Sequence, residues 1–104
     1  MPYSAEYTVP IDRLSFMRVV KKLVASKKGI SDWQRGILLR HRLIEDLRFT
    51  ADGVGSLTPN LNDCFERVEL ALTTDKVKKC NTVRELVNLA WGGIPDWFKS
   101  SANL

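Results

Sequence analysis

Side chains that could carry out chemistry are few and scattered in this chain. His41 is the only histidine, and it lies between Arg40 and Arg42. The sequence places no serine or cysteine beside it, so a catalytic triad is not predicted. Cys64 and Cys80 lack the spacing of metal ligands, which argues against a structural zinc site. We expect Cys64 to be a small buried apolar side chain.

The carboxylate pair Glu45-Asp46 is the other arrangement that could suggest catalysis. Adjacent residues of a helix do not face each other, so this pair does not indicate the two opposed carboxylates of a glycosidase. The sequence therefore predicts a protein that is not an enzyme.

The chain has 104 residues, which fits one domain with a single hydrophobic core. We expect residues 1–10 to form an extended arm and residues 94–104 a tail rich in aromatic side chains. No apolar run approaches the roughly 20 residues that cross a membrane, and the start lacks a secretory signal, so we expect a cytoplasmic location and no membrane partner. The net charge of +4 is compatible with an anionic partner or with a simply solvated surface.

Helical spacing of apolar residues is the main structural pattern, and no segment alternates as a strand would. A first helix is predicted from the N-cap Asp12 to Gly29. A second is predicted from Ser31, in a capping box with Gln34, to Leu47, with apolar residues on two sides. Residues 48–58 are expected to form an exposed, glycine-containing loop.

The second half of the chain contains the most regular apolar stripe. We expect a helix to begin at Thr58-Pro59 and to present Leu61, Cys64, Phe65, Val68 and Leu72 on one side. One short helical turn is expected within residues 73–80. The last helix begins at a Thr82–Glu85 capping box and ends at Gly92-Gly93. The prediction is an all-α four-helix bundle.

Three features of the second half occur in a distinctive order. An acidic, leucine-bearing segment, Leu43-Ile44-Glu45-Asp46-Leu47, precedes a Gly/Ser turn at Gly53-Val54-Gly55-Ser56, and a closing helix follows at Thr82-Val83-Arg84-Glu85-Leu86-Val87. This order resembles the acyl carrier protein family over about half of the chain. The resemblance implies a carrier-type helical fold and a serine that bears 4'-phosphopantetheine. It also implies transport of an acyl or aminoacyl thioester among partner enzymes.

The attachment serine can be placed in two registers. Without a gap, Asp52-Gly53-Val54 falls on the Asp-Ser-Leu motif of the family, and Gly53 replaces the serine. In the other register Gly55-Ser56-Leu57 falls on the motif, and Ser56 is the attachment residue. A helix N-terminus would favour the phosphodiester of the arm. If Ser56 is not modified, the resemblance implies a carrier-shaped protein that serves protein contacts.

Acidic residues of the predicted third helix are the candidate partner-binding residues. Asp63, Glu66 and Glu69 are expected on its solvent side, and the equivalent face of carrier proteins meets basic patches on partner enzymes. Arg67 and the basic run Lys76, Lys78 and Lys79 dilute this negative charge. An ordinary solvated face is the competing interpretation.

Two further classes of function remain open. A small basic helix-turn-helix protein would read nucleic acid with the Ser31 helix, through Gln34, Arg35, Arg40 and Arg42. A helical interaction protein would use aromatic anchors, namely Trp33, Trp91, Trp97 and Phe98.

Overall fold

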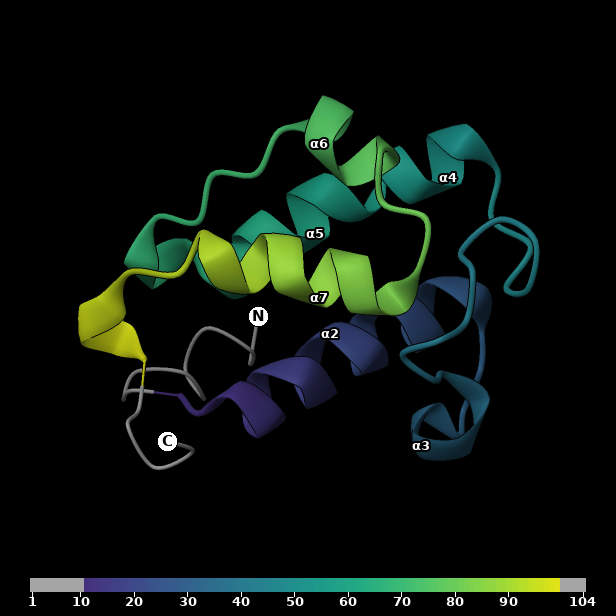
Figure 1. The fold of residues 1–104 in the computed structure, drawn as a ribbon, viewed down its shortest axis with the longest axis horizontal. Helices are drawn as coiled ribbons and strands as arrows, with labels where there is room; N and C mark the ends of the chain where they lie inside the picture. Colours follow the sequence, from purple (N-terminus) through teal and green to yellow (C-terminus); the bar gives the residue numbers. More distant parts are fainter. Residues whose placement is uncertain (1–10, 100–104) are drawn as a thin grey trace.

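Residues 11–99 are described by a computed structural model of the chain, and their regular elements are all helical (Figure 1). The expected arm at residues 1–10 and the last five residues of the expected tail lie outside this range. Two isolated bridges, Ile11 to Lys99 and Arg42 to Thr82, are the extent of β-type pairing in the described range. The predicted all-α class is confirmed for this part of the chain.

The first helix, α2 (Arg13–Lys28), has the predicted boundaries. The Asp12 carboxylate accepts a hydrogen bond from the Ser15 amide at 2.7 Å, which satisfies one of the free amides at the helix start. Gly29 adopts a left-handed φ of 68°, and its amide bonds to carbonyls of the last turn. The buried face of α2 comprises Phe16, Val19, Val20, Leu23, Val24 and Ala25.

The predicted second helix is wrong beyond its first turn. Helix α3 (Trp33–Gly36) has four residues, and its N-cap is Asp32 rather than Ser31. Residues 37–50 then form turns, in which Ile37, Leu43, Leu47 and Phe49 are buried. On a single helix these apolar side chains would face more than one side. In the structure each is buried at a different point of a turning connection.

The expected exposed loop over residues 48–58 is also wrong. Thr50 caps helix α4 (Ala51–Gly55), and α5 (Leu57–Cys64) follows directly, one residue before the predicted start. Gly55 is buried against α6 (Thr74–Lys78), where a Cβ would lie 3.0 Å from Thr74 Cγ2 and 2.7 Å from Lys78 Cε. The glycine that suggested a loop is therefore a point of close helix packing.

The apolar stripe that begins at Leu61 faces the core, but no long helix carries it. Helix α5 ends at Cys64, and a 3-10 turn, η1 (Glu66–Val68), leads to Glu69 with a left-handed φ of 58°. Four members of the stripe are buried and Leu72 is half-buried. The side chain of Asn62 bonds to both the amide and the carbonyl of Leu72, at 2.9 and 3.1 Å, and holds the returning segment.

The final elements agree closely with the prediction. Helix α6 is the expected short turn, and α7 (Val83–Gly92) begins with the Thr82–Glu85 capping box. Its predicted apolar face, Val83, Leu86, Val87 and Ala90, is buried. The tail contains the 3-10 turn η2 (Asp96–Phe98) and folds back, since the Ile11 amide donates to the Phe98 carbonyl at 2.8 Å. Trp97, however, is 70% exposed.

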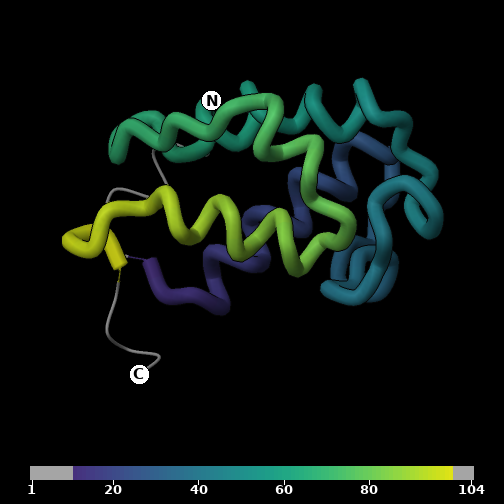
Figure 2. Tube along the Cα trace, turned by 45° about the horizontal axis from the view of Figure 1, so that its top comes forward, coloured from purple at the N-terminus to yellow at the C-terminus, as the bar shows by residue number. Residues whose placement is uncertain are grey.

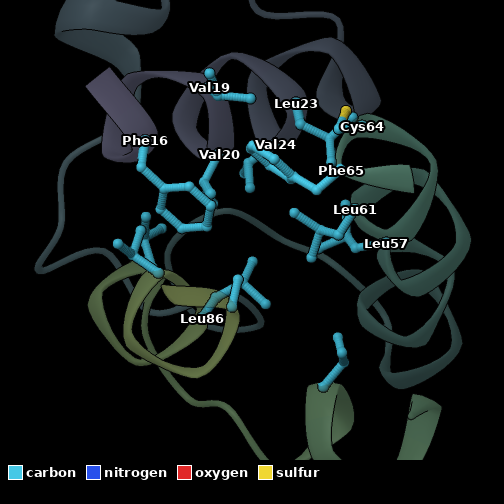
Figure 3. Close-up of a cluster of buried hydrophobic side chains, with 14 of the residues drawn as sticks. Phe16, Val19, Val20, Leu23, Val24, Leu57, Leu61, Cys64, Phe65 and Leu86 are labelled. Carbon is cyan, nitrogen blue, oxygen red and sulfur yellow. The ribbon is translucent and has the colours of Figure 1, made fainter. Parts of the chain in front are cut away.

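The core lies between α2, α5 and α7 (Figure 3). Phe16 is fully buried, and its ring centroid lies 4.9 Å from that of Phe65 and 5.1 Å from that of Trp91. Figure 2 shows α4, α5 and α6 along one side of the molecule, and α2 contacts both α5 and α7. The described chain thus has three helices of eight residues or more, with shorter helices around them, in place of the four expected.

Candidate functional site

Ser56 lies where α4 meets α5, with an exposed side chain. Its hydroxyl donates to the Gly53 carbonyl at 2.6 Å, and its amide donates to the Asp52 carbonyl at 2.9 Å. The residues on either side, Gly55 and Leu57, are buried. The side chain of Ser56 is therefore exposed at a position fixed by its neighbours.

The first turn of α4 corresponds to the ungapped register of the carrier motif. Thr50 Oγ1 accepts a hydrogen bond from the Gly53 amide at 2.9 Å, so this helix start already has its cap. The Asp52 carboxylate lies 3.4 Å from Lys78 Nζ. Ser56 follows this turn and does not lie in it. Attachment at Ser56 remains a prediction.

Asp63, Glu66 and Glu69 are exposed, but they do not form a row on one helix. Asp63 is on α5, Glu66 is on η1, and Glu69 is the left-handed residue that ends η1. Because α5 stops at Cys64, the three carboxylates follow a turning backbone, with exposed Arg67 among them. Their role in partner binding remains a prediction.

Two grooves flank α7, and sequence reasoning found neither. The first, here called the Leu89 groove, has a volume of about 480 Å³ and lies between α7 and the segment before α6. Leu72 and Leu89 are half-buried there. Gly93 allows the close approach, because a Cβ would lie 2.7 Å from Leu70 Cδ1. The lining residues are Glu69, Leu70, Ala71, Leu72, Lys76, Asn88, Leu89, Gly92 and Gly93.

The second, here called the Arg84 groove, has a volume of about 320 Å³ and lies between α2, residues 38–40 and the start of α7. It is lined by Met17, Lys21, Leu38, Leu39, Arg40 and Arg84. The three apolar side chains are half-buried, while Arg40 and Arg84 are exposed. The groove therefore combines an apolar floor with a cationic edge.

Hydrogen bonds fix the connection that forms one wall of the Arg84 groove. The Val83 amide donates to the His41 carbonyl and the Arg84 amide to the Leu39 carbonyl, both at 3.0 Å. His41 Nδ1 accepts from the Leu38 amide at 3.0 Å. The single histidine thus shapes a turn, and the first two amides of α7 are bonded to this turn.

Ion pairing or burial shifts the pKa of Asp46 and of both cysteines. Arg42 Nη2 lies 3.2 Å from Asp46 Oδ1, and this hydrogen-bonded contact lowers the pKa of Asp46. Arg42 Nε also lies 3.5 Å from Glu45 Oε2, so one guanidinium pairs with both members of the carboxylate pair. Burial, followed by the nearby charge of Glu85, raises the pKa of Cys80 to about 11.

Burial also raises the pKa of Cys64, and it is the main cause of that shift. Both cysteines are free thiols, and thiolate is the reactive form, so neither side chain is an activated nucleophile. Within residues 11–99 no cluster of histidine, cysteine and carboxylate side chains could hold a metal ion. None of the helices in that range is long and apolar enough to cross a membrane.

The residues predicted to read nucleic acid do not lie on one helix, and most of the predicted aromatic anchors are not open to a partner. Gln34 and Arg35 lie on α3, whereas Arg40 and Arg42 fall in the turns after it, so the expected reading helix is not formed. The Trp33 ring has Lys21 and Lys22 ammonium groups 5.7 and 5.4 Å from its centroid.

Cations likewise cover the Trp91 ring. Lys99 Nζ lies 5.0 Å and Arg13 Cζ 5.9 Å from its centroid, and the Arg13 guanidinium also bonds to Asn88. Phe98 is buried. Trp97 is thus the predicted anchor that is mainly exposed.

The sequence did contain a weak indication of the grooves. Met17 and Leu89 are apolar residues that fall beside the main stripes of their helices and are only half-buried. Comparison with protein-family models, with curated proteins and with solved structures finds no match for this chain.

Proposed function

We propose that this chain is a non-catalytic domain of carrier-like shape that acts by binding other proteins along the two sides of α7. The observation that supports this most directly is the pair of grooves, each with half-buried apolar side chains and a charged edge. Protein interfaces have the same composition, an apolar centre within a polar rim. One helix that borders two such grooves is suited to holding partner segments on both sides.

The carrier-like shape is supported by the order and packing of the helices. A long first helix, a second helical segment formed by α4 and α5, and a capped last helix share one core. Of the predicted acidic residues, Glu69 lies at the edge of the Leu89 groove. A partner that occupies this groove would therefore meet Glu69 and Lys76, which both line it.

Photo-crosslinking tests the binding role, because it reports which surface a partner touches. A photoreactive p-benzoylphenylalanine is placed at Leu89 in one variant and at Leu39 in another, and the variants are irradiated in the cells that make the protein. Lys27, an exposed residue of α2 outside both grooves, is the matched control position. We expect discrete crosslinked species from each groove position and not from the control. Equal crosslinking from Lys27, or none from Leu89 and Leu39, would contradict the proposal.

A second candidate function is that of a phosphopantetheine carrier, which the exposed hydroxyl of Ser56 favours. In that reaction Ser56 Oγ attacks the β-phosphorus of coenzyme A. A new O–P bond joins the serine to the arm, the bond to 3',5'-ADP breaks, and the serine proton is lost to solvent. Attachment also removes the hydroxyl donor to Gly53, whose hydrogen bond has a net value of about 0.5–1.5 kcal/mol.

Intact-mass measurement distinguishes the two candidates. The protein is incubated with coenzyme A and a phosphopantetheinyl transferase of broad specificity, beside a Ser56→Ala variant. The carrier function requires a gain of one arm in the wild-type protein and none in the variant. If the mass is unchanged, the carrier candidate is rejected, and the binding role is unaffected.

A further inference from the structure

We infer that the Arg84 groove binds an acidic protein segment in which an apolar side chain is flanked by carboxylates. The inference rests on the proposed function and specifies the chemistry of the partner for one of the two grooves. It reverses the polarity expected from the carrier resemblance, in which this protein would supply the acidic surface.

The charges that line the groove have one sign. Lys21, Arg40 and Arg84 are the titratable groups in its lining, and none of them forms an ion pair with another residue in the range 11–99. Such unpaired cations around one concave surface attract a segment of opposite charge and increase its rate of association.

The acidic residues on the elements around the groove already have partners. The Glu85 carboxylate accepts hydrogen bonds from the Asn81 and Thr82 amides. Asp32 caps α3 and pairs with Arg35 at 3.8 Å. Glu45 and Asp46 both pair with Arg42. Because these carboxylates are bonded elsewhere, the three cations of the groove are available to a partner.

The backbone that carries these cations is fixed before any partner arrives. Arg84 is in the first turn of α7 and its amide is bonded to Leu39, while Arg40 lies in the turn closed by His41. Lys21 is on α2, with its ammonium group near the Trp33 ring. A surface organised in this way loses little conformational entropy on binding.

The apolar floor favours a protein segment over a nucleic acid. Met17, Leu38 and Leu39 are half-buried and offer contacts to an aliphatic or aromatic side chain. A phosphate backbone gains nothing from such a floor, and base stacking requires an open aromatic face. Trp33, the ring beside the groove, is already contacted by two ammonium groups. The start of α7 is not an anion site, because its first amides are bonded to the connection.

Fluorescence anisotropy with a synthetic peptide tests the inference on the full chain. The probe is a labelled peptide with one leucine between pairs of glutamates, and its control carries glutamines in their place. The protein variants are Arg40→Glu combined with Arg84→Glu, and Arg67→Glu combined with Lys79→Glu. The second pair makes the same change in net charge with exposed residues that do not line the groove. Thermal unfolding confirms that each variant is folded.

We expect saturable binding of the acidic peptide that weakens as salt is raised, because exposed charges are screened over about 10 Å at 0.1 M salt. Each exposed ion pair changes affinity by up to about fivefold, so reversing two charges in the groove should weaken binding by about tenfold or more. The control pair should change affinity less than about threefold, and the glutamine peptide should bind more weakly than the acidic one.

Three outcomes would overturn the inference. These are the absence of saturable binding at millimolar peptide, an equal loss of affinity in both pairs of charge reversals, and tighter binding of a single-stranded oligonucleotide that is lost in the groove variant. The last outcome would assign the groove to nucleic acid. Leu89 lies in the other groove, so crosslinking from Leu89 does not depend on these cations. If the peptide test fails but Leu89 still crosslinks, the inference about the Arg84 groove is wrong and the proposed binding role stands.

Discussion

Truncation of Phe16 to alanine is the most direct test of how the core is assembled. Phe16 lies on α2, is fully buried, and contacts Phe65 after α5 and Trp91 on α7. One ring therefore joins the three longest helical segments. The variant loses the transfer free energy of the ring, two aromatic contacts and the packing around the cavity left behind.

The expected loss of stability can be estimated from these terms. Replacing a buried phenylalanine by alanine costs about 3–5 kcal/mol, and each aromatic pair contributes about 0.5–1.5 kcal/mol beyond its buried area. A domain of this size is stable by about 5–15 kcal/mol, so the loss is a large share of the total. Phe16→Leu keeps most of the volume and loses mainly the aromatic contacts, so we expect a cost of about 1–3 kcal/mol.

Urea unfolding followed by circular dichroism and tryptophan fluorescence measures this loss. Both probes should give one transition, and its midpoint should fall while its slope is unchanged. Ile44→Ala is the control, because this side chain is 47% exposed and its loss should cost less than about 1 kcal/mol. If Phe16→Ala lies within about 1 kcal/mol of the wild type, the three-helix core described here is wrong.

Three other predictions concern the helix ends and the thiols. Thr82→Ala should destabilise the protein by about 1 kcal/mol in urea, and Thr82→Ser should restore most of this, because the hydroxyl caps the Glu85 amide. Gly29→Ala should cost about 1 kcal/mol in the same assay, since its φ of 68° strains any residue with a Cβ. The pKa of Cys80 is raised to about 11, so the folded protein retains a proton that the unfolded chain loses near pH 9. Stability should therefore fall as pH rises from about 9 to 11, and Cys80→Ser should reduce that fall.

The outcomes that would contradict these predictions are equally specific. A Thr82→Ala variant as stable as the wild type would exclude the capping box as a stabilising element. An unchanged Gly29→Ala variant would mean that the end of α2 is not left-handed in solution. Rapid alkylation of Cys80 in the folded protein at pH 8, at the rate of the unfolded chain, would show that its thiol is neither buried nor raised in pKa.

The ends of α2 and α7 could be predicted from the sequence because short-range contacts determine them. Asp12 caps an amide three residues away, and Thr82 and Glu85 satisfy each other within one turn. Gly29 ends α2 through hydrogen bonds from its amide to the carbonyls of Ala25 and Ser26 in the last turn. The buried face of α7 followed from helical spacing alone. For these two helices, the local hydrogen bonds and the apolar spacing both indicate the same helical structure.

Residues 37–57 were mispredicted because their conformation depends on distant partners. Leu43 bonds to Asn81, and Gly55 packs against Thr74 and Lys78, which are far along the chain. A run of apolar residues such as Ile37 to Leu47 matches a helix by its pattern. It becomes a turning connection because its members are buried at separate places.

What the sequence determined by itself is the all-α class of the described range, the two capped helices, and the direction in which the apolar stripes face. The grooves beside α7 were decided only by tertiary structure. They exist because the amides of Val83 and Arg84 donate hydrogen bonds to carbonyls of the turn closed by His41, and because Gly93 lets Leu70 approach α7. Such contacts join residues tens of positions apart, so the pairing that creates them has no local pattern from which it could be predicted.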